Sequence, residues 1–352
     1  MPPIAAEPGA EIEVTDPGAW DALVRAAPAG ELYHTTAWLD HLAKTYGVEV
    51  VRLGVVRGGE LVGGLPLLLR RVGPFLLAGS PLTNVATPQM GPLHLDQDGE
   101  AEVLAAFDRF QRRRGVGLAE IIYGQPGSDD ALAALGYRVS DSLTLVVDLR
   151  HRSVDDLWRG FEGRSRTAIR KAEREGVTVE VAEDPVYIDE YVRMAGAVYG
   201  RQRRPPPIPA AFYRDLWDRF AASGVLRPLV ARHQGRTIAA ALFLIWGGRV
   251  YYQDGAGYPE HNHLGANNLI QWELLKWAVG QGLDSYDMVG AGLPAIARFK
   301  ASFGGVLVRR PLARRTNSPS AAAALEVYRR AAPLGRRLRW RLRAGIGGEG
   351  RP

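Results

Sequence analysis

Apolar and polar residues follow the same pattern in two separate parts of this chain. Residues 50–69, VVRLGVVRGGELVGGLPLLL, contain two runs of β-branched and apolar residues on either side of Arg-Gly-Gly-Glu. Residues 227–246, RPLVARHQGRTIAAALFLIW, repeat this arrangement around Gly235. Apolar runs joined by a glycine turn are typical of β-hairpins. The pattern therefore predicts two hairpins of the same design.

The segments around the two hairpins match in kind and order. An amphipathic helix is predicted before each hairpin, at 36–47 and 210–224, and another after it, at 100–115 and 266–282. Each later helix ends at glycine and leads into a short apolar strand, a short helix and a last strand. The predicted fold class is α+β, an internal duplication of one unit with a mixed, mainly antiparallel sheet.

The two copies differ in the short helix before the last strand. The first copy has Ala-Leu-Ala-Ala at 131–134, whereas the second has Arg298, Phe299 and Lys300. Because the first copy builds the scaffold without a cation, the residues peculiar to the second copy are candidates for chemistry. The alternative is that Lys300 is a solvated helix residue.

Charge adds a possible polyanion partner. The chain has 352 residues and a net charge of +6, and its arginines crowd toward the C-terminus. They are Arg309, Arg310, Arg314, Arg315, Arg329, Arg330, Arg336, Arg337, Arg339, Arg341 and Arg343. Clustered arginine is typical of surfaces that bind RNA, nucleotide phosphates or acidic lipid. A solubilising tail is the alternative.

Several classes of protein are disfavoured. The chain has no cysteine, which excludes disulfides, thiolate metal sites and a cysteine nucleophile. His261 and His263 have only Glu260 beside them, so we expect a polar loop and no metal site. The N-terminus lacks a basic region followed by an apolar run, and no apolar stretch reaches the length of a membrane span. We expect a cytoplasmic, monomeric protein.

Three stretches carry a resemblance to a known family. They are the basic helix and Gly-Val strand at 164–181, the Asn-containing helix and Asp-ending strand at 265–290, and RFKASFGG at 298–305. The last resembles the Phe-Lys-x-x-Phe-Gly-Gly signature of the Fem family, aminoacyl-tRNA-dependent transferases that lengthen peptidoglycan side chains. The order of elements resembles two GNAT acyltransferase domains in tandem, from about residue 30 to 345.

The resemblance implies roles for individual residues. It implies that Lys300 stabilises the oxyanion that forms when an amine attacks an ester, in keeping with the general chemistry of acyl transfer. Phe299 would pack beside Lys300, and Arg298 would contact phosphate. Asp287, at the end of a strand, would take the amine's proton or cap the following loop. Further substrate-binding candidates are Tyr252, Asp254, Asn267, Arg204 in the proline-rich loop at 200–209, and Trp38 and Lys44 on the early helix.

The chain departs from the family at one strand. Peptidoglycan-building members carry Asp-Pro at the end of the first domain's central strand, where this chain has Gly124 and Gln125. Separately, Arg112, Gly115 and Gly117 fit the Arg-x-x-Gly-x-Gly loop with which GNAT enzymes hold coenzyme A. That loop normally follows a strand and enters a helix, whereas this one follows a predicted helix and enters a strand.

These observations predict two domains and an acyl transfer function. Domain one is expected at 1–150, with a basic helical segment at 318–345 packing back on it, and domain two at 151–317. The expected reaction moves an aminoacyl group from aminoacyl-tRNA to an amine of a peptidoglycan precursor or biosynthetic intermediate, with no cofactor. One alternative is an acyl-CoA-dependent N-acyltransferase. Another is a non-catalytic module that binds RNA or glycan.

Overall fold

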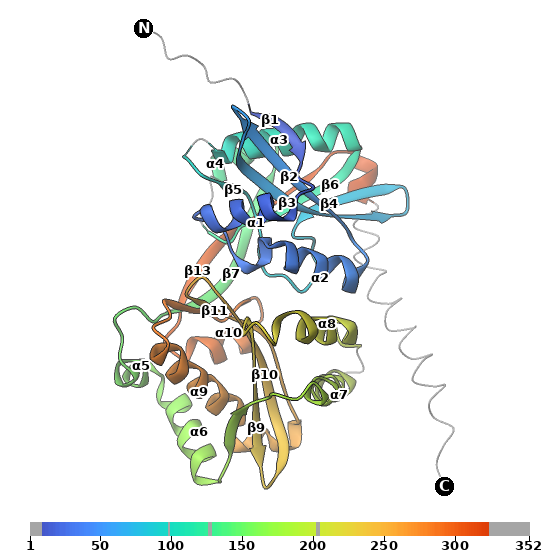
Figure 1. Cartoon of the computed structure of the whole chain (residues 1–352). Coiled ribbons are helices and arrows are strands. Elements are labelled where there is room, and N and C mark those ends of the chain that lie inside the picture. The colour runs from blue at the N-terminus through green and yellow to red at the C-terminus, as the bar shows by residue number, and fades with distance from the viewer. Residues whose placement is uncertain (1–8, 98, 126–128, 202–204, 324–352) are drawn as a thin grey trace, which may run out of the picture. The chain divides into compact units, whose positions relative to one another are not determined.

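Two compact units form the part of the chain that the structure describes. This computed structural model describes residues 9–97, 99–125, 129–201 and 205–323 (Figure 1). Within that part, the first unit comprises residues up to Ser142 together with those from Arg309 onward, and the second comprises Leu143–Val308. No helix among the described residues combines the length and hydropathy needed to span a membrane.

The first unit is a sheet with helices on both faces. Its elements are β1 (Ala10–Glu13), α1 (Pro17–Ala26), η1 (Leu32–His34), α2 (Thr36–Tyr46), β2 (Glu49–Arg57), β3 (Glu60–Val72), β4 (Phe75–Ser80), β5 (Leu93–His94), α3 (Gly99–Arg114), β6 (Val116–Ile122) and α4 (Asp129–Ala134). The helix α3 packs on β2 and β3 from one side, and α1 and α2 pack on the other (Figure 1).

The second unit repeats this design. Its elements are β7 (Arg138–Asp148), which begins in the first unit, α5 (Val154–Gly160), α6 (Gly163–Arg174), β8 (Thr178–Val181), α7 (Val186–Arg201), α8 (Ala210–Phe220), β9 (Leu226–His233), β10 (Arg236–Trp246), β11 (Arg249–Gly257), η2 (Pro259–Leu264), α9 (Ala266–Gly280), β12 (Ser285–Asp287), α10 (Pro294–Ala301) and β13 (Val306–Thr316). The helices α6 and α9 lie on one side of the sheet, and α7 and α8 lie on the other (Figure 1).

Strand pairing is the same in both units. In the first, β2, β3 and β4 pair antiparallel, and β4 then pairs parallel with β6. In the second, β9, β10 and β11 pair antiparallel, and β11 pairs parallel with β12. The parallel pairs are joined by α3 and α9, because a parallel connection needs a crossover helix. The prediction of a mixed, mainly antiparallel sheet in an α+β fold is confirmed.

The two units exchange their last strands. The strand β7 follows the first copy's short helix α4, yet its end pairs antiparallel with β12 of the second unit, with Val147 opposite Tyr286. The strand β13 follows the second copy's α10, yet its end pairs antiparallel with β6 of the first unit, with Ala313 opposite Ile121.

This exchange moves the expected domain boundaries. The chain passes from the first unit to the second within β7, at residues 142–143, and returns within β13, at 308–309. The sequence alone assigns each last strand to its own copy and therefore predicts these boundaries after 150 and 317. Residues 318–323 belong to the first unit. The rest of the predicted C-terminal basic segment lies outside the described residues.

Candidate active site

The Phe-Lys-x-x-Phe-Gly-Gly segment ends α10 and turns into β13. Phe303 is 1% exposed, and its ring packs edge-on against the rings of Phe161 and Phe299, each with its centroid 5.2 Å away. Gly304 has a φ of +78°, and a Cβ there would lie 3.2 Å from the carbonyl oxygen of Gly160, so a side chain would be strained. The phenylalanines and Gly304 therefore serve the fold, which leaves the lysine of the signature to be explained.

Lys300 is a buried cation. It is 5% exposed, and its Nζ donates hydrogen bonds to the carbonyl oxygens of Val289 and Gly290, the latter at 2.8 Å. The Nζ also lies 5.3 Å from the centre of the Tyr252 ring. The alternative interpretation, a solvated surface lysine, is therefore wrong.

The loop that Lys300 holds has an unusual backbone. Val289 has a φ of +48° and Gly290 a φ of +64°. A β-branched residue rarely adopts the left-handed conformation, which costs about 1–3 kcal/mol and persists where the surroundings enforce it. The two hydrogen bonds from Lys300 supply that enforcement, so the lysine and the strained loop form one structural unit.

Two carboxylates lie near this lysine. Burial lowers the pKa of Lys300 to about 8, and the negative charges of Asp287 and Asp254 partly counteract that effect. Asp287, 4% exposed, accepts hydrogen bonds from the Thr144 hydroxyl at 2.5 Å and from the Val289 N–H at 2.8 Å. Asp287 was expected either to take the amine's proton or to cap the following loop, and these contacts are typical of a carboxylate that caps the loop.

Asp254 has a different environment. Burial raises its pKa, and hydrogen bonds from Tyr213 and from the N–H of Gly255, with the charge of Lys300, partly offset that rise. The Tyr213 hydroxyl donates to Asp254 Oδ2 at 2.5 Å, and the Gly255 N–H donates to Oδ1 at 2.9 Å. Unlike Asp287, Asp254 remains partly exposed. It is thus a half-buried carboxylate with a raised pKa.

The other residues expected at this site in the second unit have different contacts. Phe299 is half-buried against the core, and the exposed Arg298 accepts a hydrogen bond from Arg164 through its backbone carbonyl, at 2.6 Å. Asn267, on α9, lies beside Gly257, where a Cβ would come within 3.3 Å of its Nδ2. Arg204 lies outside the described residues.

A substitution at Val289 tests whether the loop is strained. Val289→Gly is expected to stabilise the protein by about 1 kcal/mol, because glycine adopts positive φ without steric cost. Thermal unfolding should then show a melting temperature about 2–4 °C higher. The control is Val306→Gly, at an exposed strand position, which should destabilise the protein. Equal destabilisation by both changes would mean that the loop stores no strain.

Trp38 and Lys44 both lie on α2 of the first unit. Trp38 is completely buried, its Nε1 donates to the Thr87 hydroxyl at 3.0 Å, and its ring packs edge-on against Tyr33. The expectation that Trp38 helps to bind the acceptor is therefore wrong, because its side chain belongs to the core. Lys44 is exposed in the last turn of α2.

A buried polar cluster in the first unit was not predicted. Glu31 is 1% exposed, and one of its carboxylate oxygens accepts a hydrogen bond from Gln89 at 2.6 Å. Arg310 donates to the side-chain oxygen of Gln89. A Cβ at Gly124 would lie 3.1–3.3 Å from the Glu31 carboxyl group. The first unit thus has a carboxylate beside the end of β6, but it comes from the segment before η1 and requires glycine at position 124.

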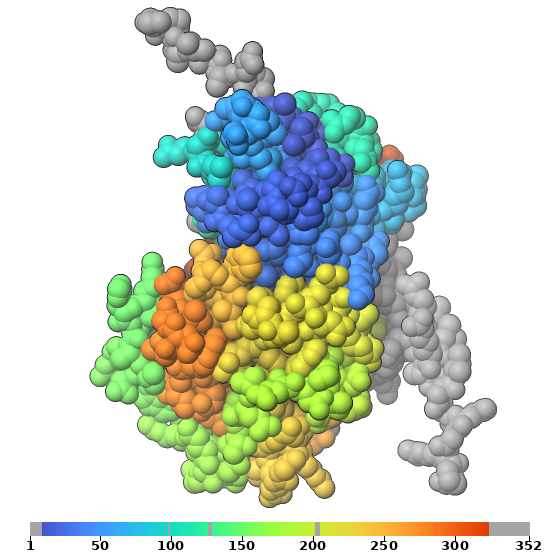
Figure 2. All heavy atoms as spheres, in the orientation of Figure 1, coloured from blue at the N-terminus to red at the C-terminus, as the bar shows by residue number. Residues whose placement is uncertain are grey.

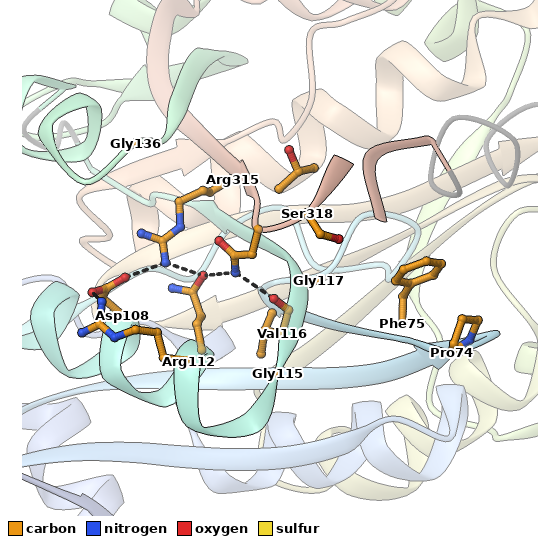
Figure 3. Close-up of a pocket in the computed structure, with 13 residues that line it drawn as sticks. Pro74, Phe75, Asp108, Arg112, Gly115, Val116, Gly117, Gly136, Arg315 and Ser318 are labelled. Carbon is orange, nitrogen blue, oxygen red and sulfur yellow. Dashed lines mark hydrogen bonds and ion pairs between the residues drawn. The ribbon is translucent and has the colours of Figure 1, made fainter. Parts of the chain in front are cut away.

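A cavity of about 670 Å³ opens at the other end of β6 (Figure 3). Its polar floor is already paired. Arg315 donates to Asp108 at 2.6 Å and to Gln111 at 2.9 Å, Asn317 donates to Gln111 at 3.2 Å, and Arg112 pairs with Asp108. The lining residues are Pro74, Phe75, Asp108, Gln111, Arg112, Gly115, Val116, Gly117, Gly136, Arg315, Thr316, Asn317 and Ser318.

The Arg112–Gly117 loop lines this cavity at the C-terminal end of α3. Helix C-termini present carbonyl groups, which repel phosphate, whereas a pyrophosphate site needs the N–H groups of an N-terminus. The position of the loop therefore argues against a coenzyme A site here. Among the described residues, no cluster of three or more His, Asp or Glu side chains could hold a metal ion.

Comparison with known proteins relates both sequence and fold to acyltransferases. The acetyltransferase (GNAT) domain family matches residues 159–301. A curated relative, the UDP-N-acetylmuramoylpentapeptide-lysine N(6)-alanyltransferase of Weissella viridescens, is 23% identical over 165 residues. That match covers 45% of this chain and 46% of the relative, so it spans about half the length of each.

Two solved structures share the fold over nearly their whole length. FemX superimposes with a TM-score of 0.68 at 17% identity, covering 86% of this chain and 96% of that one. A tandem GNAT protein from the clavulanic acid biosynthesis pathway gives a TM-score of 0.54 at 14% identity, covering 88% and 99%. The chain thus has a tandem GNAT-like fold, and its resemblance to the Fem family is confirmed by sequence over about half of its length and by fold.

Proposed function

We propose that this protein transfers an aminoacyl group from aminoacyl-tRNA to an amine of a peptidoglycan precursor. The observation that carries the proposal is the buried Lys300, fixed by two carbonyl groups beside two carboxylates in the second unit. Support for the acceptor comes from the alanyltransferase relative, whose name specifies the lysine of a muramoyl pentapeptide. Support for the RNA donor comes from the Fem resemblance.

The chemistry fits a direct attack without a covalent enzyme intermediate. The amine's lone pair adds to the ester carbonyl carbon, and negative charge gathers on the carbonyl oxygen. The bond from carbon to the ribose oxygen then breaks, and the proton lost by the amine passes to that oxygen, which leaves an amide and a ribose hydroxyl. An ammonium group has three N–H donors, and the carbonyls of Val289 and Gly290 take two of those of Lys300. The third would stabilise the oxyanion.

The amine must lose a proton in this reaction. We assign its acceptance to Asp254, because burial raises the pKa of this carboxylate and the residue, unlike Asp287, is only half-buried. Tyr213 orients the carboxylate through its short hydrogen bond. Asp287 instead positions the loop that Lys300 holds. In this assignment the cation, Lys300 on α10, and the base, Asp254 on β11, are different groups of the second unit.

Mass spectrometry of the acceptor tests the proposal. The full-length protein is incubated with a mixture of charged tRNAs and a muramoyl pentapeptide that contains lysine. The expected result is a product heavier by one aminoacyl residue. The control is the same pentapeptide with its lysine side chain acetylated, which should gain nothing. An equal gain on the blocked peptide, or no gain with any charged tRNA, would refute this acceptor.

A further inference from the structure

The helix α6 carries more positive charge than its packing requires. Its twelve residues, Gly163–Arg174, include Arg164, Arg166, Arg170, Lys171 and Arg174, against one acidic residue, Glu173. The apolar side of the helix, with Ile169 and Ala172, is fully buried in the core of the second unit. The five cations therefore lie away from this buried side of the helix, which belongs to the green part of the surface in Figure 2.

Two of the five cations have structural roles. Arg166 Nη1 donates to the carbonyl oxygens of Arg159 and Phe161, at 3.1 and 2.8 Å, and so ties α5 to α6. Arg164 pairs with Glu162 at 2.8 Å and donates to the carbonyl of Arg298. These two arginines are explained by the fold.

The other three cations are not explained in this way. Arg170 and Arg174 are both exposed and stand one turn apart, a spacing at which like charges destabilise a helix by about 0.2–0.5 kcal/mol. Arg174 approaches Glu175 at 3.8 Å, a weak surface pair. Lys171 is half-exposed on the next position around the helix, and the exposed Thr167 lies one turn before it. The group is a row of cations with a hydroxyl at its start.

Arg170 rests on a fixed platform. Its guanidinium carbon lies 5.3 Å from the centre of the Trp158 ring, a cation–π contact. Trp158 in turn packs against Trp272, with ring centroids 5.0 Å apart. A held guanidinium loses less conformational freedom when it binds a ligand, so this arrangement favours binding.

The first turn of α6 contacts the helix that carries Lys300. Ser165 Oγ, in the first turn of α6, lies 2.6 Å from Ser302 Oγ, and the Glu162 N–H donates to the Ser302 carbonyl at 2.9 Å. Ser302 is the C-cap of α10, the helix that carries Lys300. The row from Thr167 to Arg174 follows this turn along the solvent-facing side of α6, over about 10 Å of helix axis.

We propose that the face formed by Thr167, Arg170, Lys171 and Arg174 binds backbone phosphates of the donor RNA while its aminoacyl end reacts at Lys300. This inference rests on the proposed function for the identity of the donor. An anionic lipid surface is the competing partner for such a row. The exposed positions of α6 carry no apolar side chain that could enter a bilayer, because Ile169 is buried, so RNA fits better.

Salt dependence of RNA binding tests the proposal. The probe is a fluorescent RNA hairpin with the sequence of a tRNA acceptor arm, uncharged, so that binding is measured without transfer. Each phosphate that a cation neutralises adds about 0.7–0.9 to the slope of log affinity against log salt. The triple variant Arg170→Gln, Lys171→Gln, Arg174→Gln should flatten the slope by about 2–3.

A matched triple variant removes the same charge elsewhere in the second unit. Arg150, Arg214 and Arg232 each pair with a carboxylate, and their change to glutamine should leave the slope unaltered. The proposal would be overturned if both triple variants flattened the slope equally. It would also be overturned if the α6 triple variant lost its binding to anionic vesicles but kept its binding to RNA. If the slopes differ as expected but no charged tRNA is consumed, the proposed function fails and the RNA surface stands.

Discussion

Lys300→Met is expected to lower kcat for acyl transfer by about 100- to 1,000-fold, which corresponds to about 3–4 kcal/mol of transition-state stabilisation. Methionine matches the length and volume of the lysine stem but carries no charge. The variant therefore removes the third N–H donor that we assign to the oxyanion, and it also releases the carbonyls of Val289 and Gly290. The measurement is steady-state transfer by folded variants at saturating donor.

The pH profile separates this role from that of a base. Because burial lowers the pKa of Lys300 to about 8, the ammonium form should be lost as pH rises through 8, and kcat should fall with it. A lysine acting as a base would give the opposite trend. Lys300→Arg should rescue little, since a planar guanidinium cannot replace a compact ammonium held by two carbonyls.

Lys276→Met is the matched control for this prediction. Lys276 lies on α9, pairs with Glu273 at 2.8 Å and is 37% exposed, so its loss should be almost silent. If Lys300→Met retains turnover within a factor of three of the wild type, Lys300 has no part in the chemistry and serves the loop alone.

Acidification from pH 6.5 to 4 is expected to destabilise the first unit by up to about 3 kcal/mol through His34. His34 is completely buried, its Nδ1 accepts the Glu31 N–H at 3.2 Å, and its Nε2 lies 3.3 Å from the Gly91 carbonyl. These partners require a neutral ring protonated on Nε2, and burial lowers the pKa to about 4.

The sign follows from proton binding. Between pH 4 and 6.5 the unfolded chain takes up a proton on this histidine and the folded chain does not. The contribution of His34 to the free energy of unfolding is therefore fully present above pH 6.5, and it is lost as the pH falls through 4. Denaturant unfolding at several pH values measures it. His34→Gln, whose amide can make both hydrogen bonds without titrating, should remove this part of the acid sensitivity.

The control for the histidine prediction is His233→Gln, at a half-exposed position on β9. That variant should keep the acid sensitivity of the wild type. If His34→Gln loses as much stability on acidification as the wild type does, the buried carboxylates and not His34 dominate the acid response.

Much of the fold could be predicted from local pattern. The hairpin at 50–69 became β2 and β3, and the helices expected at 100–115 and 266–282 became α3 and α9, because glycine turns and amphipathic periodicity act over a few residues. The exchange of β7 and β13 could not be predicted in this way. Strand partners are chosen by long-range pairing. Because β6 and β12 are equivalent strands of the two copies, the local sequence of β7 or β13 does not show which of them it joins.

The candidate site was predicted in part. Lys300 stood out because the first copy lacks a cation at that place, and Asp254 and Asp287 because each lies at or near the end of a strand. Tyr213 gave no signal, since an aromatic residue on the inner face of an amphipathic helix is typical of a core. The positive φ of Val289 was equally hidden, because valine in a sequence favours extended backbone.

Trp38 illustrates the opposite error. Its position on an early helix matched a family region used for ligand binding, but its side chain is buried with a satisfied Nε1 hydrogen bond. Glu31 was missed for a related reason. It lies nearly a hundred residues before Gly124, and only the folded chain brings its carboxylate to the end of β6.

Charged RNA is the proposed donor of the acyl group at Lys300. The most direct test is a single-turnover experiment with full-length wild type and Lys300→Met, each given labelled aminoacyl-tRNA or labelled acetyl-CoA with the same amine acceptor. We expect the wild type to transfer label from aminoacyl-tRNA and to give no product from acetyl-CoA, and we expect Lys300→Met to slow transfer at least 100-fold. Product from acetyl-CoA with none from aminoacyl-tRNA would contradict this proposal.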